Sequence, residues 1–297
     1  MKILITGDIS DWNIANFSIK SITPLFQNII KEADICIYNL EGPIAVNNHV
    51  NDMKISLNPV ANLFWKFIIS AAGKKQPLVI STANILALCE LNPNTILTLA
   101  NNHIKDLGNE GLENTINLLE SNGIKAIGAG LSSLMKYSIH LTEKIIVLNI
   151  NLVGAKKYGL PLYLYNARWH GFGAAYLSYA ELKTQIKQYQ TENKKVILIV
   201  HAGKVLPSNI ESSGIDLNIF RSLDADIVVI HHIHQYLSGE WEIDNIFMLG
   251  DFIFNDPNHL PSIRKSAALM ISYENEVFVP KIIPFSVNEV YQYEQIR

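Results

Sequence analysis

Six short apolar runs in this sequence each end in a group of polar or metal-binding side chains. The runs are residues 3–7, 35–38, 96–100, 196–200, 227–230 and 246–249, and the groups after them hold Asp8, Glu41, Asn102 with His103, His201, His231 to His234, and Asp251. Runs rich in Ile, Val and Leu are typical of buried strands, and ligand sites in α/β folds gather beyond the carboxyl ends of such strands. We therefore expect the six groups to meet in one place.

The side chains that would meet there are typical of a transition-metal site. They comprise carboxylates, an Asn amide and several imidazoles, without a thiolate. Oxygen and nitrogen ligands of this kind suit Mn, Fe, Zn, Co or Ni better than Ca or Mg, which prefer shells made only of oxygen. The sequence thus predicts a site for divalent transition-metal ions.

Each motif taken alone also has a plainer interpretation. A single carboxylate after a strand, such as Asp8 or Glu41, is usually a helix cap or a solvated loop residue, and a single His201 is more often structural than a ligand. The run His231-His232-Ile233-His234 is different, because on a strand a spacing of two places the rings of His232 and His234 on the same side. The joint occurrence of all these groups favours metal binding.

These residues resemble a known family. In order, the matching segments are Gly7-Asp8, Asn39-Leu40-Glu41-Gly42-Pro43, Ala100-Asn101-Asn102-His103 with Asp106, Gly108, Gly111 and Thr115, Gly128-Ala129-Gly130, His201-Ala202-Gly203, His232-Ile233-His234 and Leu249-Gly250-Asp251-Phe252. They resemble the capsule-synthesis (poly-gamma-glutamate biosynthesis) protein family of the calcineurin-like metallophosphoesterase superfamily. The resemblance runs from residue 1 to about residue 256.

The resemblance implies an α/β fold, a four-layer αββα sandwich of the calcineurin-like metallophosphoesterase type, with a two-metal centre at its strand ends. By position, Asp8 and His234 would bind the first metal, and Asn102, His201 and His232 the second. Glu41 would stand at the bridging carboxylate. His103 would be catalytic rather than a ligand, with Asp106 as the carboxylate that holds it.

Four positions depart from the pattern that the resemblance implies. Ser10 stands where the superfamily has an imidazole in Asp-x-His, so the first metal would have fewer ligands. Val205 replaces the Glu of His-x-Gly-x-Glu, Ile233 replaces the Pro of His-Pro-His, and Asp251 replaces the Asn of Gly-Asn-Phe.

The predicted chemistry is hydrolysis of a phosphoester or a related bond in the biosynthesis of a capsule or another cell-envelope polymer. Two cations can clamp the attacking and leaving oxygens of an in-line displacement, and His103 could protonate the departing group. The alternative for His103 is a hydrogen bond that holds Asn102. The rival for the whole protein is a non-catalytic protein that keeps the fold but only binds a polymer or a partner enzyme.

Composition limits the remaining possibilities. With 297 residues, of which 48% are hydrophobic, the chain can bury a large core, and we expect one domain over residues 1–297. The net charge of -3 argues against a nucleic-acid surface. Two cysteines offer no disulfide framework. Because Met1 leads directly into the first strand and no apolar run approaches the roughly 18 residues of a membrane span, we expect a cytosolic protein.

Periodic stripes predict helices after Thr23-Pro24 and after Asn58-Pro59, and two more around Leu112 to Leu119 and Leu182 to Tyr189. The tail from Ala267 to Ile283 predicts a β-hairpin. Residues 47–58 are interpreted as a solvated loop. Residues 156–176, which carry Lys156, Arg168 and Trp169, are interpreted as a lid that grips an anionic or sugar-bearing substrate.

Overall fold

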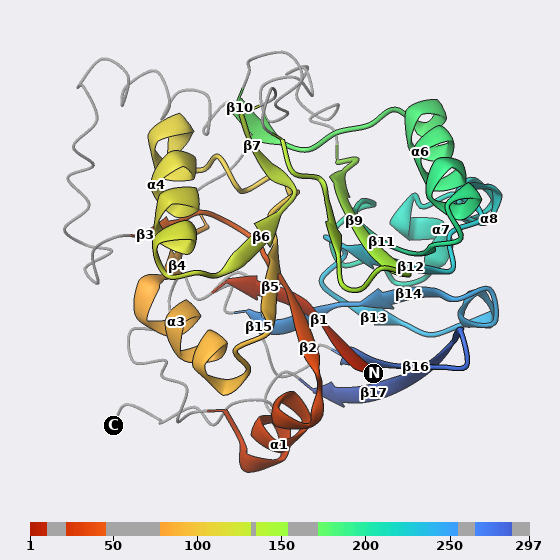
Figure 1. The fold of residues 1–297 in the computed structure, drawn as a ribbon, viewed down its shortest axis with the longest axis horizontal. Coiled ribbons are helices and arrows are strands. Elements are labelled where there is room, and N and C mark those ends of the chain that lie inside the picture. Colours follow the sequence, from red (N-terminus) through yellow and green to blue (C-terminus); the bar gives the residue numbers. More distant parts are fainter. Residues whose placement is uncertain (11–21, 46–77, 132–134, 154–171, 255–264, 287–297) are drawn as a thin grey trace.

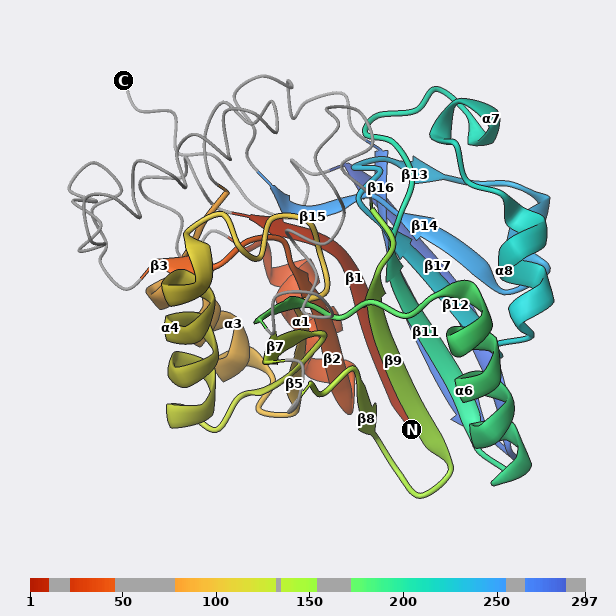
Figure 2. The same cartoon turned by 90° about the horizontal axis from the view of Figure 1, so that it is seen from above.

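The computed structural model describes residues 1–10, 22–45, 78–131, 135–153, 172–254 and 265–286. Within these ranges two large β-sheets pack face to face, and helices cover both outer faces (Figures 1 and 2). Three apolar clusters separate the layers, one between the sheets and one beneath the helices on either side. The expected four-layer αββα sandwich is thereby confirmed.

The first sheet is built around β1 (Lys2–Ser10). Its strand order is β17 (Val277–Ser286), β16 (Lys265–Glu274), β1, β2 (Ile35–Leu40), β5 (Thr95–Thr98) and β6 (Lys125–Ile127), and β15 (Asp251–Phe254) also pairs with β1. The pairings of β1 with β2 and β15, of β2 with β5 and of β5 with β6 are parallel. The predicted hairpin is confirmed, since β16 and β17 pair antiparallel at one edge of this sheet.

The second sheet has four parallel strands at its centre. Its order is β13 (Tyr236–Leu237), β14 (Ile246–Leu249), β12 (Ile227–His231), β11 (Lys195–His201), β9 (Ile145–Asn151) and β8 (Ser138–His140). Two short ladders join β3 (Ile44–Ala45) to β4 (Ile80–Ser81) and β7 (Ala129–Leu131) to β10 (Phe172–Ala174). Each of the six predicted apolar runs lies on a strand of one of the two large sheets or extends just past its end.

Helices α1 (Pro24–Glu32), α3 (Thr82–Leu91) and α4 (Gly108–Ser121) lie on the first sheet, and α6 (Tyr179–Thr191) and α8 (Leu217–Leu223) on the second (Figure 1). The short α7 (Ile210–Ser213) and the 3-10 turn η6 (Glu240–Glu242) complete the helical elements of the described part. The predictions of α1, α4 and α6 are confirmed. The helix expected after Pro59, the loop at 47–58 and residues 156–171 of the expected lid lie outside the described residues.

The local sequence explains where these helices begin and end. Pro24 stands in the first turn of α1, where its missing N–H costs nothing. Ser178 and Glu181 form a capping box at the start of α6. Gly123, with φ of 68°, follows the end of α4. Among the described residues, no helix combines the length and the apolar character that crossing a membrane requires.

The strands are apolar on both faces because both are covered. In β11, Val196, Leu198 and Val200 pack beneath the helices, whereas Ile197 and Ile199 face the other sheet. This alternation follows from the two-residue period of a strand. Burial on both faces is what turns the sequence of such a strand into a continuous apolar run.

The chain passes from the second sheet to the first through a single residue, Gly250. β14 ends at Leu249 and β15 begins at Asp251, while Gly250 has a left-handed φ of 76°. The backbone N–H of Asp8 donates to the Gly250 carbonyl at 2.9 Å. A Cβ atom on Gly7 would lie 2.1 Å from that same oxygen. Two glycines therefore allow the crossing to touch β1 and bring Asp251 beside Asp8.

Candidate metal centre

Three carboxylates and four imidazoles meet where the central parallel strands of both sheets end. Asp8 lies in β1, Glu41 follows β2, Asp251 begins β15, His201 and His231 end β11 and β12, and His232 and His234 follow β12. All seven residues are buried. The expectation that distant strand ends converge is confirmed.

Two overlapping groups of these side chains have the spacing of metal ligands. One comprises Glu41, His232 and His234, and the other comprises Asp8, His234 and Asp251. Within each group the ligand atoms lie within 4.8 Å of one another. The two groups share His234, and two such buried groups are consistent with a dimetal site.

His232 and His234 reach the site by a different route from the one predicted. The strand β12 ends at His231, so these two residues lie in a loop and the argument from strand alternation is wrong. Both adopt left-handed backbone conformations, with φ of 86° for His232 and 54° for His234. Such values are uncommon for residues other than glycine, and they cluster at functional sites. The loop therefore directs both rings to Glu41.

His201 and Asn102 extend the group around Glu41. The Nε2 atom of His201 lies 2.8 Å from Asn102 Oδ1 and 3.4 Å from Glu41 Oε1. It also lies 3.1 Å from Nδ1 of His232. The structure thus brings Asn102, His201, His232 and Glu41 together, and their roles as ligands of a second metal remain a prediction.

Glu41 carries the strongest local signal for a cation. Its side chain is 0% exposed, and within the described part of the chain neither carboxylate oxygen has a hydrogen-bond partner. Burial by itself raises the pKa of Glu41, yet the positive charge of His234 and contacts with His201 and His232 hold that pKa well below its ordinary value. A buried anion with unmatched lone pairs is costly unless a cation is present. The residues present therefore fit a bound metal.

The imidazoles around Glu41 differ in protonation. Burial, together with the neighbouring imidazoles, lowers the pKa of His232 to about 4. Burial alone would lower the pKa of His234 as well. The negative charges of Glu41 and Asp251 outweigh this effect and raise the pKa of His234 to about 10. His232 is thus neutral and ready to coordinate at neutral pH, whereas His234 must lose a proton to do so.

Asp8 is held by two residues, Asn39 and His231, to which the sequence interpretation gave no role as ligands. Asn39 donates from Nδ2 to Asp8 Oδ1 at 2.7 Å, and His231 Nδ1 lies 2.9 Å from the same oxygen. His234 Nδ1 lies 2.7 Å from Asp251 Oδ1. The position of Asp251 directly after an apolar run places it among the groups expected to meet, but the sequence interpretation gives it no role as a ligand.

His103 and Asp106 lie on the loop between β5 and α4. His103 Nδ1 lies 2.7 Å from Asp106 Oδ2, and that same oxygen accepts the Leu78 N–H at 2.9 Å. The side chain of His103 is 15% exposed while that of Asp106 is 0% exposed. The pair expected from the sequence is therefore formed, with the buried carboxylate behind the ring. A catalytic role for it remains a prediction.

Ser10, at the position of the missing imidazole, is buried, and its hydroxyl has no hydrogen-bond partner among the described residues, which leave out residues 11–21. Because Ser10 offers no nitrogen ligand, any first metal depends on Asp8, His234 and Asp251, with Glu41 near them. Asp251 supplies a charge where the resembled pattern has a neutral amide.

Comparisons with known proteins show the family to which the chain belongs. Residues 2–256 match the family model described as bacterial capsule synthesis protein PGA_cap. A probable polyglutamine synthesis accessory protein of Mycobacterium tuberculosis is 34% identical over 132 residues, with the same result for two strains of that organism. That alignment covers 43% of this chain and 29% of each relative.

Two solved structures are similar in outline. One is the protein TT1561 of Thermus thermophilus, with a TM-score of 0.46 and 10% identity over 96% of this chain and 98% of the other. The second is a dimetal phosphatase from Danio rerio, with a TM-score of 0.36 and 9% identity over 76% and 89% of the two chains.

Proposed function

We propose, from the premise that this chain belongs to the bacterial capsule synthesis protein PGA_cap family, that it is a metal-dependent hydrolase. Its proposed substrate is a phosphoester formed in the biosynthesis of a capsule or another cell-envelope polymer. The observation that carries the proposal is the buried Glu41 carboxylate, whose oxygens face His201, His232 and His234 and have no hydrogen-bond partner among the residues that the structure describes. A purely structural carboxylate at this depth would be hydrogen-bonded.

The site residues form two groups, each of which would hold one divalent ion such as Mn, Fe, Zn, Co or Ni. Asp8, Asp251 and His234 would hold the first ion, and Asn102, His201 and His232 would hold the second. Glu41, which faces His201 and His234, would offset repulsion between the ions. When bound, such ions stabilise negative charge on a phosphoryl group and make water a better nucleophile near neutral pH.

His103 is the proposed general acid. Asp106 accepts a hydrogen bond from Nδ1 and fixes the ring, so that an imidazolium presents its Nε2 proton to the departing oxygen. Asn102, the residue before His103, contacts His201, which ties the position of the loop to that of the metal ligands. Proton transfer of this kind typically contributes about 10²- to 10⁴-fold.

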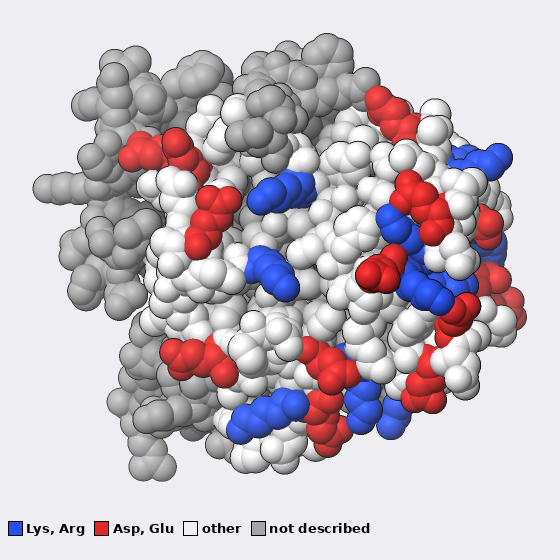
Figure 3. Space-filling model, viewed as in Figure 1, with Lys and Arg blue, Asp and Glu red and all other residues white. Residues whose placement is uncertain are grey.

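The substrate is proposed to be anionic or sugar-bearing rather than a nucleic acid. On the face shown in Figure 3, Lys and Arg side chains are interspersed with Asp and Glu and do not gather into one basic patch. The net charge of -3 agrees with that distribution. A nucleic-acid site requires a concentrated positive surface.

The rival is a non-catalytic protein that binds a polymer or a partner enzyme. The observation in its favour is Ser10, whose buried hydroxyl takes the place of an imidazole. If the first site stays empty, the remaining ion could hold the fold together without catalysing hydrolysis. The two functions make different predictions for His103, which is not a proposed metal ligand. A hydrolase should depend on His103 for turnover, whereas a non-catalytic protein should not.

Three histidine variants test the proposal. The protein is purified without chelator, its metal content is measured, and hydrolysis of a phosphoester panel is followed with added Mn. His232→Ala should lose metal and activity together, whereas His103→Ala should keep its metal and lose on the order of 10²-fold in turnover. His140→Ala, at an exposed position in β8, is the matched control and should change neither. Metal-loaded protein without activity on any ester would favour the rival.

A further inference from the structure

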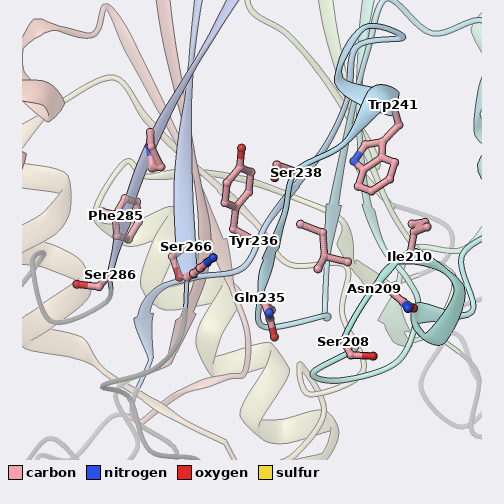
Figure 4. Close-up of a pocket in the computed structure, with 13 residues that line it drawn as sticks. Ser208, Asn209, Ile210, Gln235, Tyr236, Ser238, Trp241, Ser266, Phe285 and Ser286 are labelled. Carbon is pink, nitrogen blue, oxygen red and sulfur yellow. The ribbon is translucent and has the colours of Figure 1, made fainter.

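A cavity of about 730 Å³ lies in the second part of the chain, outside the group of predicted metal ligands. Its walls come from the β16–β17 hairpin, from the segment Gln235–Ser238 and from the chain before α7 (Figure 4). Gln235 is the residue directly after the predicted ligand His234. The cavity has the size of a small-molecule site, and its walls join elements of both sheets.

Aromatic side chains frame this cavity. Phe285 and Trp241 lie on opposite sides of it, with Tyr236 between them (Figure 4). Trp241 packs closely on Gly239, because a Cβ atom at residue 239 would lie 2.3 Å from the indole ring. Tyr236 is fixed by the hydrogen bond that its hydroxyl donates to Glu242 at 3.0 Å. The aromatic faces are therefore held in place before any ligand arrives.

Polar atoms at the cavity wall have unused hydrogen-bonding capacity. Ser266 is 0% exposed, and its hydroxyl has no hydrogen-bond partner in the described ranges of the chain. The indole N–H of Trp241 is also buried, and it too has no partner in those ranges. A buried donor left without a partner typically costs about 1–3 kcal/mol. A ligand bearing hydroxyl groups could satisfy both atoms.

The charge of the lining limits the choice of ligand. Among the described lining residues, Lys265 carries the only charge, and the rest are hydroxyl, amide, aromatic or aliphatic. A chain of glutamates brings one carboxylate per residue and would need several cations to match it. A sugar brings hydroxyl groups and an apolar ring face, the two features that Ser266 and Trp241 complement.

We propose that this cavity binds a glycan, with sugar rings against the aromatic side chains and at most one acidic group beside Lys265. The cavity wall begins at the residue after His234, so a bound glycan could form part of the hydrolysed substrate. This part of the inference rests on the proposed function. Binding of the glycan itself does not depend on that function.

The test uses the whole chain on an array of neutral oligosaccharides and oligosaccharides with a single uronic acid or phosphate, beside γ-linked and α-linked glutamate trimers. Glycans that bind are then titrated by calorimetry, with and without EDTA. Trp241→Ala should weaken binding about tenfold. Lys265→Gln should weaken only the acidic glycans, to the affinity of their neutral counterparts. Lys281→Gln, an exposed lysine on β17, is the matched control and should change nothing.

Gly239→Ala provides a second route if Trp241→Ala fails to fold, because the added methyl group displaces the indole ring. It should weaken glycan binding as well. The proposal is overturned if only glutamate trimers bind, if no glycan binds, or if glycan binding is unchanged in both variants. Loss of binding with EDTA would place the ligand on the metals and would also overturn it. Binding that persists with EDTA but is accompanied by no phosphoesterase activity would support the cavity and contradict only the proposed function.

Discussion

The two sheets contribute opposite kinds of side chain to the candidate metal centre. The first sheet provides the carboxylates Asp8, Glu41 and Asp251, and the second provides the imidazoles His201, His231, His232 and His234. Neither sheet alone holds a set that could bind a metal ion in the proposed way. The centre is therefore a property of the interface between sheets, and its chemistry depends on how they are packed.

The largest effect is expected from removing the carboxylate that faces the imidazoles of the other sheet. Glu41→Gln preserves shape but eliminates the charge, so metal affinity should fall by more than about 100-fold and activity should be lost. Metal titration and phosphoester assays check this. Glu113→Gln, at an exposed position in α4, is the matched control. If Glu41→Gln retains both metals, Glu41 does not lie between them.

The next largest effect is expected at the contact between β1 and Gly250, where the chain crosses from one sheet to the other. Gly7→Ala places a methyl group against the Gly250 carbonyl, and we expect a loss of about 3 kcal/mol in the free energy of unfolding. Gly123→Ala, whose added methyl meets no described atom within 4 Å, should cost only about 1 kcal/mol for its left-handed φ. Urea denaturation of both variants gives the comparison. Equal losses would mean that the crossing tolerates displacement.

A smaller and more selective effect is expected at Asp251. Asp251→Asn retains the shape of the side chain but removes one negative charge from the group of Asp8 and His234. The affinity of the first site should fall about 10- to 100-fold while the second site is unchanged, which stepwise Mn titration would resolve. The control is Asp224→Asn, because residue 224 is exposed and asparagine tolerates its left-handed φ. Equal weakening of both sites would contradict separate roles.

The smallest effect concerns Lys105, the only buried lysine or arginine among the described residues. Burial lowers the pKa of Lys105 to about 8 from 10.5, and its Nζ donates to the Phe172 carbonyl at 3.1 Å. Between these two pH values the unfolded chain binds more protons, so the free energy of unfolding rises with pH. Relative to Lys105→Met, the wild type should gain stability from pH 8 to pH 10. A difference independent of pH would contradict the shifted pKa.

The sequence predicted the buried strands better than it predicted the site, while the four layers were implied by the family resemblance. Apolar runs such as Val196 to Val200 indicate buried strands because both faces of each strand are covered, and this requirement is visible locally. The pairing of Asp251 with His234 depends instead on the crossing at Gly250, which no local pattern reveals. His232 and His234 were assigned to the site by their spacing, although the backbone that orients them is a left-handed loop.

The glycan cavity could not have been predicted for a related reason. Its lining residues Ser208, Trp241 and Phe285 come from three separate segments with no motif in common. Their proximity follows from the pairing of β16 with β1 and from the place of β13 at the edge of the other sheet. A sequence pattern indicates a site where the site residues recur in one element or directly after strands, and the lining residues of this cavity do neither.

The crossing at Gly250 also determines when the metal centre can form during folding. Asp8 and Asp251 are paired in register on β1 and β15, although almost the whole chain separates them in sequence. Contacts of such high sequence separation require long loops to close, and they tend to form late. A folding chain therefore completes most of both sheets before it can capture the first ion. We expect metal binding to follow the folding of the sheets and to consolidate a nearly finished structure.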